Sequence, residues 1–276
     1  MIVGDDGSVL TLVRQDDHQR QCLALARAWG GAGFARLPRW RSVERAAARH
    51  DDGWIAADAR PGIGEGGLPV DFPDVPRGVH AAFYEAGVAA VQADDPWAGL
   101  VCCLHARGLY ERRLGLDGPR PPRASRPTVE RAFVAVQLRR QARLERRLGA
   151  EAAGWAWDAF RLLQAWDALS LYLTWTGLRR GATWTLASVP TRPGDLDGVN
   201  LTVGAVDGRT ATVTPWPFAA DVVDVPVRVR RVARRAYRSD AHLARVLAAT
   251  RTSGVAYRVV PGGATRSRGV TPPRRA

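Results

Sequence analysis

The chain has 276 residues, of which 46% are hydrophobic, so it can bury a substantial core and is not expected to be disordered. Its formal net charge is +13, and all 40 basic residues are arginine because the sequence contains no lysine. The arginines are spread along the whole chain, which indicates a general preference for arginine more than one basic patch. Nucleic-acid binding is therefore possible but not favoured, and the planar guanidinium group also suits a small anionic substrate.

The cysteines and the N-terminal residues indicate where in the cell the protein is located. Cys22, Cys102 and Cys103 cannot all pair within one chain and none belongs to a CxxC pair, so we expect reduced, buried thiols. Residues 1–10 lack the basic and apolar segments of a signal peptide, and no stretch approaches roughly 18 consecutive apolar residues. We therefore expect a soluble, cytoplasmic protein without a membrane partner.

Apolar periodicity predicts a mainly helical N-terminal part. A short strand, Val9–Val13, comes first, and Gly30-Gly31 ends the first helix after it. Asp95-Pro96 has the proline expected in the first turn of a helix, and the Pro- and Arg-rich residues 117–127 are expected to form a linker. The predicted helices cover residues 16–29, 42–50, 79–92, 95–112, 128–148 and 151–178.

Residues 55–76 are rich in glycine and proline and are expected to form a long irregular loop. They do not form a phosphate-binding loop, because no predicted strand precedes them and no GK[ST] sequence follows. A loop of this length in a compact domain is usually functional, for instance as a lid over a pocket.

The pattern changes after Gly181, where apolar and polar residues alternate as in strands. Val206-Asp-Gly-Arg209 predicts a hairpin, and Pro226 is expected to interrupt the strand around it. The predicted strands are 183–189, 201–206, 210–214, 222–232 and 255–260, with one short helix at 239–250. We thus predict a mainly α protein: a helical domain over residues 1–178, a small C-terminal β-rich appendage over 179–262, and a disordered basic tail over 263–276.

Four of the five histidines recur about once per predicted helix, each on the apolar face. They are His18, His50, His80 and His105, whereas the fifth, His242, is expected at the surface. Two carboxylates, Asp51 and Asp167, stand in equally apolar surroundings. Each residue alone is more often a hydrogen-bonded core residue than a ligand, but together they indicate a shared metal site, since buried His and Asp need partners.

The order His…His-Asp…His…His…Asp resembles that of the HD-domain superfamily, specifically its dinuclear-metal branch. The resemblance covers about residues 15–175 and implies an HD-like helical bundle there. Carried over residue by residue, it makes His18, His50, Asp51 and Asp167 the core metal ligands. His80 and His105 would then complete the second metal, and Asp51 would bridge both metals as the catalytic carboxylate.

Longer words in the sequence resemble, more specifically, an uncharacterised bacterial domain-of-unknown-function family, which supplies no activity. These words are HDDGW (50–54), LHARGLY (104–110), WDALSL (166–171) and TPWPF (214–218).

One position departs from the superfamily pattern. Many HD enzymes have Lys or His three residues after the Asp of the pair, where this chain has Trp54. Without lysine, any cation that binds the substrate must be arginine, and Arg49, Arg60 and Arg107 are the nearest candidates in the sequence.

The resemblance implies two divalent transition metals and leaves three functions open. Imidazole and carboxylate ligands suit Fe, Mn, Zn or Ni. The first function is a dinuclear phosphohydrolase that acts on a small phosphorylated or otherwise anionic substrate through a metal-bound hydroxide. With two irons, the same ligand order resembles the mixed-valent diiron oxygenases that cleave a C–C or C–P bond. The third is a non-catalytic anion- or nucleic-acid-binding protein, and a homo-oligomer remains possible.

Overall fold

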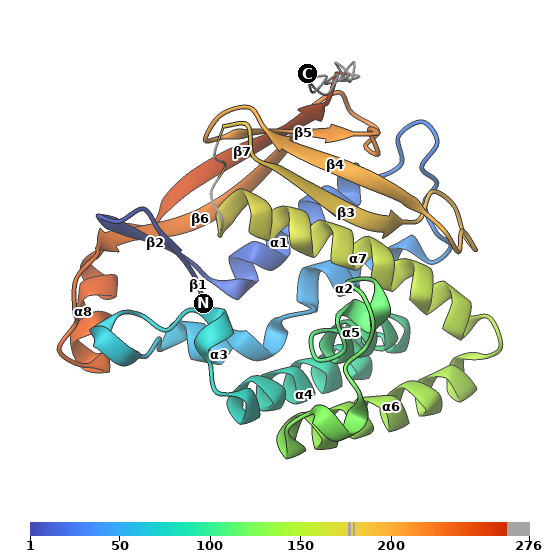
Figure 1. The fold of residues 1–276 in the computed structure, drawn as a ribbon, viewed down its shortest axis with the longest axis horizontal. Coiled ribbons are helices and arrows are strands. Elements are labelled where there is room, and N and C mark those ends of the chain that lie inside the picture. The colour runs from blue at the N-terminus through green and yellow to red at the C-terminus, as the bar shows by residue number, and fades with distance from the viewer. Residues whose placement is uncertain (176–177, 179, 264–276) are drawn as a thin grey trace, which may run out of the picture.

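The computed structural model of the chain describes residues 1–175, 178 and 180–263. About half of the chain is helical and about 20% lies in strands. In Figure 1 a curved sheet covers helices α1 and α7, and α4, α5 and α6 lie on the far side of these two helices. The helices are α1 (Gln15–Ala28), α2 (Trp40–Arg49), α3 (Ile55–Ala59), α4 (Arg77–Asp94), α5 (Pro96–Gly108), α6 (Thr128–Leu148), α7 (Ala152–Thr174) and α8 (Asp240–Ala249).

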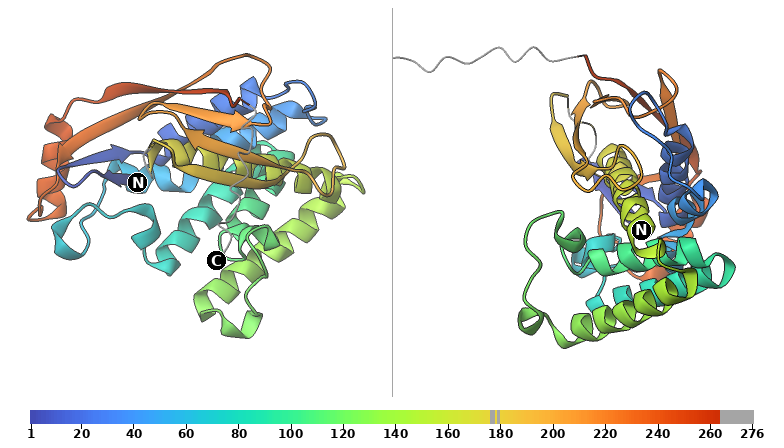
Figure 2. Two further views of the ribbon diagram at one scale, coloured as in Figure 1. Left: turned by 45° about the horizontal axis from the view of Figure 1, so that its top comes forward. Right: turned by 90° about the vertical axis from the view of Figure 1, so that its right-hand side faces the viewer.

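A seven-stranded mixed sheet has the order β1-β2-β6-β7-β5-β4-β3. Neighbouring strands are antiparallel except β5 and β7, which are parallel. Figure 2 shows the sheet curving over the helices. The strands are β1 (Ile2–Asp5), β2 (Val9–Val13), β3 (Thr183–Val189), β4 (Val199–Ala205), β5 (Thr210–Thr214), β6 (Val223–Ala233) and β7 (Ser253–Pro261).

The predicted fold class, a mainly helical HD-like bundle with a small β-rich appendage, is wrong. The N-terminal strands β1 and β2 join the C-terminal strands through β6, where Val9 pairs with Ala233 and Leu12 with Arg230. One hydrophobic core includes residues of both the helices and the sheet, and Trp29, directly after α1, contacts Phe218 with ring centroids 5.7 Å apart. Alternating sequence patterns predicted six of the seven described strands, all except β1, but not their shared sheet, because strand pairing is non-local.

Strand β6 shows how the sheet closes over the helices. Valines at alternate positions are buried while the residues between them are exposed, as expected for a strand with one face on the core. The predicted interruption at Pro226 is absent, since this residue pairs in register with Ala256 of β7. β2 pairs only with residues 230–233 of β6, so Pro226 has a partner strand on one side alone, where the missing N–H is tolerated.

The predicted helices and the hairpin between β4 and β5 are confirmed, with small shifts at the ends. Local chemistry explains several boundaries. Asp95 caps α5 by accepting hydrogen bonds from the Trp97 and Ala98 N–H groups at 3.0 and 3.1 Å, with Pro96 in the first turn. Gly149 ends α6 with a φ of 99°, which glycine adopts readily.

The long loop over residues 55–76 is less irregular than predicted, because it contains α3 and two short 3-10 turns. Asp71 fastens it on both sides: one carboxylate oxygen accepts from the Val3 N–H at 2.9 Å and the other from Trp175 Nε1 at 2.8 Å. Its role as a lid stays a prediction.

Two further predictions from the sequence concern the C-terminal tail and membrane-spanning helices. The predicted tail, 263–276, lies outside the described residues apart from Gly263. No helix in the described part of the chain is long and apolar enough to cross a membrane.

Candidate metal centre

Four helices and the residues that directly follow α2 bring five of the six predicted ligands together in the interior of the protein. His18 belongs to α1, His105 to α5 and Asp167 to α7. His50 directly follows α2 and still has helical backbone angles, whereas Asp51 leaves the helical conformation with φ −111° and ψ 20°. This change of direction lets two consecutive side chains of the His50-Asp51 pair reach the same cluster.

The two carboxylates and the imidazoles face one another. His18 Nε2 lies 2.9 Å from Asp167 Oδ1 and 3.9 Å from Asp51 Oδ2. His50 Nε2 lies 3.5 Å from Asp51 Oδ2 and 3.8 Å from Asp167 Oδ1. His105 Nε2 is 3.9 Å from the other oxygen of Asp51. Three imidazoles thus surround two carboxylates, Asp51 and Asp167, which are 116 residues apart in the sequence.

The cluster is almost closed to solvent. The residues His18, His50, Asp51 and His105 are all buried, whereas the Asp167 side chain is 14% exposed. No arginine in the described part of the chain forms an ion pair with either carboxylate. Buried acidic groups without a fixed cationic partner need a proton or a metal ion to balance their charge.

The tautomer of His50 supports a metal ion. Its Nδ1 lies 3.1 Å from the Ala47 carbonyl, and a carbonyl can only accept, so Nδ1 carries the proton. The Nε2 lone pair of a neutral His50 therefore points at two carboxylates, and this buried atom has no hydrogen-bond partner among the described residues. A lone pair facing carboxylate oxygens is unfavourable unless a cation lies between them.

His18 is held differently. Ser170 Oγ donates to Gln21 Oε1 at 2.8 Å, so it accepts from His18 Nδ1 at 2.8 Å. The contact of Nε2 with Asp167 then requires a second proton on the ring. Burial lowers the pKa of His18, but its contacts with Cys22 and Asp167 outweigh burial and raise that pKa well above the usual value. Burial raises the pKa of Asp167, yet the hydrogen bond from His18 and the nearby imidazoles lower it overall.

His105 is oriented by a glutamine. Gln164 Oε1 accepts from Arg113 Nε at 3.0 Å, so the amide Nε2 of Gln164 donates to His105 Nδ1 at 2.6 Å. Burial lowers the pKa of His105 to about 4, so this imidazole is neutral at neutral pH and carries its proton on Nε2, the atom that faces Asp51.

His80 lies beside the cluster but outside its two groups of mutually close ligand atoms. Its Nδ1 is 2.5 Å from the Tyr110 hydroxyl, and its ring packs on Tyr84 at 4.9 Å and on Trp54 at 5.5 Å. Burial lowers the pKa of His80 to about 4. Its predicted role as a ligand of the second metal stays a prediction.

The residues present fit a metal centre. Ligand atoms of His50, Asp51 and His105 lie within 4.8 Å of one another, and the same holds for His18, Cys22, His50 and Asp167. Mixed nitrogen and carboxylate donors suit divalent transition metals.

Two side chains at the cluster were not predicted from the sequence. The Tyr84 hydroxyl donates to Asp51 Oδ1 at 2.7 Å, and Cys22 Sγ lies 3.9 Å from His18 Nε2. Both stand four residues after a predicted ligand, His80 and His18, on the same helix. This spacing places residues on one helical face and was the signal that could have identified them.

Among the described residues, none of the three arginines predicted to bind substrate pairs with a carboxylate of the cluster. Arg49 pairs with Asp52 at 2.7 Å and Asp94 at 2.9 Å. Arg107 is buried and pairs with Glu111 at 2.7 Å. Arg60 lines a cavity of about 180 Å³ together with Trp54, whose ring contacts His80. Their roles toward a substrate stay predictions.

Fold and site together define a mixed α/β protein with a buried histidine–aspartate cluster suited to metal binding. Residues 1–234 match the family described as protein of unknown function DUF3891, and the chain belongs to that family. This confirms the resemblance to an uncharacterised family, while membership of the HD-domain superfamily is not shown. The search of curated proteins and the search of solved structures found no match.

Proposed function

We propose that this protein is a metal-dependent hydrolase of phosphoesters, divergent from but related to the dinuclear HD-domain enzymes. The observation that carries the proposal is the His50 imidazole, whose buried, unpartnered Nε2 faces the carboxylates of Asp51 and Asp167. No arginine of the described structure pairs with these carboxylates, and the one cationic partner is the protonated His18 beside Asp167. A metal ion would supply the remaining charge and would take the place of the proton on His18 Nε2.

The chain's own residues would divide the work. His18, His50 and Asp167 would hold one metal, and Asp51 with His105 the second, because these are the atoms that lie close together. Two bound divalent metals would lower the pKa of water and polarise a phosphoryl oxygen. Ser170 and the Ala47 carbonyl would accept from Nδ1 of His18 and His50 and leave Nε2 of both rings for a metal. His105 would bind through Nε2 with the Gln164 amide turned over, so that the amide oxygen accepts from His105 Nδ1. The partly exposed Asp167 marks the side from which a small anionic substrate would enter.

The test is metal content measured by elemental analysis on protein purified without a tag. We expect about two divalent metals per chain in the native protein and loss of metal in His50→Ala and Asp51→Asn. His242→Ala is the matched control, since the His242 ring is bound at the surface to the Arg238 N–H and lies far from the cluster in sequence. A panel of phosphomonoesters and phosphodiesters then tests hydrolysis by the loaded protein.

Two results would contradict the proposal. Native protein that contains no metal and takes none up on incubation would rule out a metal-dependent enzyme. Full metal content in both site variants would place the metal elsewhere.

A mixed-valent diiron oxygenase is the second candidate. It is favoured by the lack of a described arginine at the carboxylates, because phosphate binding sites usually contain such a cation. About two irons per chain, a mixed-valent signal in electron paramagnetic resonance and substrate-dependent oxygen uptake would support it over the hydrolase. The third possibility, a non-catalytic anion- or nucleic-acid-binding protein, would show binding that weakens steeply with salt and no turnover.

A further inference from the structure

We propose that Cys22 is a ligand of this centre, so that one metal ion is bound by His18, Cys22, His50 and Asp167. The proposal rests on the metal centre proposed above and adds a sulfur donor to it. One ligand atom from each of these four residues lies within 4.8 Å of the other three. The arrangement makes the two metal positions chemically unequal, because the other group of close ligand atoms, from His50, Asp51 and His105, contains only nitrogen and oxygen.

The distances agree with four-coordinate binding. Usual zinc bond lengths place two ligand atoms of a tetrahedral site about 3.6 Å apart for nitrogen and sulfur, and about 3.4 Å apart for nitrogen and oxygen. The observed separations are 3.9 Å for His18 Nε2 and Cys22 Sγ, and 2.9 and 3.8 Å for Asp167 Oδ1 with His18 and His50. These three separations lie within about 0.5 Å of the expected values, and the remaining pairs among the four atoms lie within 4.8 Å of each other.

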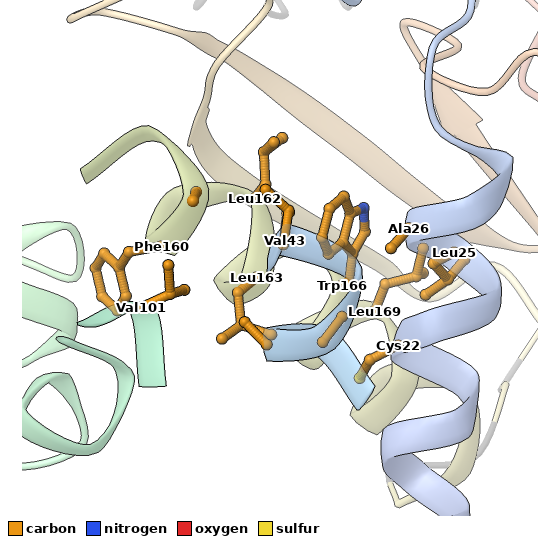
Figure 3. Packing of buried hydrophobic residues seen from close by; sticks show 14 of the residues in the cluster. Cys22, Leu25, Ala26, Val43, Val101, Phe160, Leu162, Leu163, Trp166 and Leu169 are labelled. Carbon is orange, nitrogen blue, oxygen red and sulfur yellow. The ribbon is translucent and has the colours of Figure 1, made fainter. Parts of the chain in front are cut away.

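The helix that carries the pair directs both side chains to one place. His18 and Cys22 are four residues apart on α1, so they lie on the same face. Figure 3 shows Cys22 on the side of α1 that faces Leu169 and Trp166 of α7. Asp167 belongs to the same stretch of α7, so the thiol and the carboxylate meet in one helix interface.

Two further features separate Cys22 from an ordinary core cysteine. The unpartnered Nε2 of His50 is buried within the same group of ligand atoms. Cys103, by contrast, is buried on α5 and its thiol donates to the Gln137 carbonyl at 3.2 Å, a normal environment for a core thiol. Among the residues that the structure describes, the hydrogen-bond contact of the Cys22 thiol is with His18, a proposed metal ligand.

A thiolate changes which metal the site prefers. Cysteine binds as the thiolate, so coordination replaces the S–H bond by a metal–sulfur bond and releases one proton to solvent. Sulfur donors favour Zn²⁺, Co²⁺ and Fe²⁺ and disfavour Mg²⁺ and Mn²⁺. We therefore expect selective occupation of this position by the softer metals.

The experiment is titration of the metal-free full chain with Co²⁺, followed by absorption spectroscopy. A Co²⁺–thiolate bond produces a charge-transfer band in the near ultraviolet, whereas nitrogen and oxygen ligands give only the weaker visible bands. We expect the band in the native protein and in Cys103→Ser, its absence in Cys22→Ser, and a loss of at least about 10-fold in the affinity of Cys22→Ser for Co²⁺. Circular dichroism checks that each variant is folded.

The outcomes separate the two proposals. Visible Co²⁺ bands without the charge-transfer band in native protein would overturn the role of Cys22 and leave the metal centre standing. A protein that binds no Co²⁺ at all would overturn both. If Cys22→Ser does not fold, X-ray absorption at the cobalt edge of native protein decides instead, since a sulfur neighbour at about 2.3 Å is required by the proposal and its absence contradicts it.

Discussion

Each imidazole of the cluster has a hydrogen bond at an atom that does not face the proposed metal, and this bond sets the orientation of its side chain. Single acceptors or donors fix the rings of His18, His50 and His105, and Tyr84 does the same for Asp51. Such outer partners set ligand orientation and basicity. The Tyr84 contact is the clearest to test, because its hydroxyl can be removed without changing the ring that packs on His80.

We expect Tyr84→Phe to weaken metal affinity by about 10- to 100-fold, the usual effect of losing a partner of a metal ligand. The reason is that Asp51 Oδ1 loses the proton donor that orients it. Isothermal titration with Zn²⁺ measures the change. Tyr237→Phe is the control, since the Tyr237 hydroxyl donates to the Ala233 carbonyl outside the cluster, and this variant should keep native affinity. Equal affinity of Tyr84→Phe and native protein would contradict the positioning role.

Helix α4 packs unusually tightly on the turn that follows the His50-Asp51 pair. A Cβ atom at Gly53 would lie 1.8 Å from the Phe83 carbonyl oxygen, and one at Gly87 would lie 2.7 Å from the Gly53 nitrogen. Only glycine permits backbones to approach this closely. The close approach holds Asp51 within reach of Tyr84, so packing between elements determines the geometry of the site.

We expect Gly53→Ala to lower the free energy of unfolding by at least about 1–3 kcal/mol, because the added methyl group forces the turn away from α4. Thermal and urea unfolding measure the loss, and metal affinity should fall with it. Gly154→Ala is the matched control on α7, where a Cβ atom meets nothing within 4 Å, and it should raise stability by about 0.5–1 kcal/mol through the better helix propensity of alanine. Unchanged stability of Gly53→Ala would mean that the turn is not held by this contact.

At the scale of the whole molecule, the sheet and the helices share one core. The sheet residues Val225 and Val259 belong to the same buried cluster as Leu163 and Trp166 of α7. Polar contacts join the layers as well, since Arg228 of β6 pairs with Asp17 of α1 at 2.7 Å. The cluster that faces inward from α1 and α7 therefore depends on a sheet that covers their other side.

We expect a fragment of residues 1–178 to lose native structure, because β2 would lack its partner β6 and Trp29 would lose Phe218. Near-ultraviolet circular dichroism of the tryptophans and thermal unfolding test this. A chain that ends at Gly263 is the control, since it keeps all seven described strands and every residue of the described core, and we expect it to unfold in one cooperative transition. A cooperative transition with native-like spectra in the 1–178 fragment would show that the helical part folds by itself.

Local patterns in the sequence were enough to predict most helices and strands and to select His18, His50, Asp51, His105 and Asp167, five residues that lie close together in the structure. Helical periodicity determines which face of each helix a residue occupies, so polar residues on apolar faces can be recognised without knowing the fold.

Only the tertiary structure decided that β1 and β2 belong to the sheet. It also placed Cys22 and Tyr84 at the cluster and Arg49 and Arg107 in ion pairs elsewhere. These contacts join residues far apart in the chain, and the free energy that selects among such partners comes from packing and charge balance in the folded molecule.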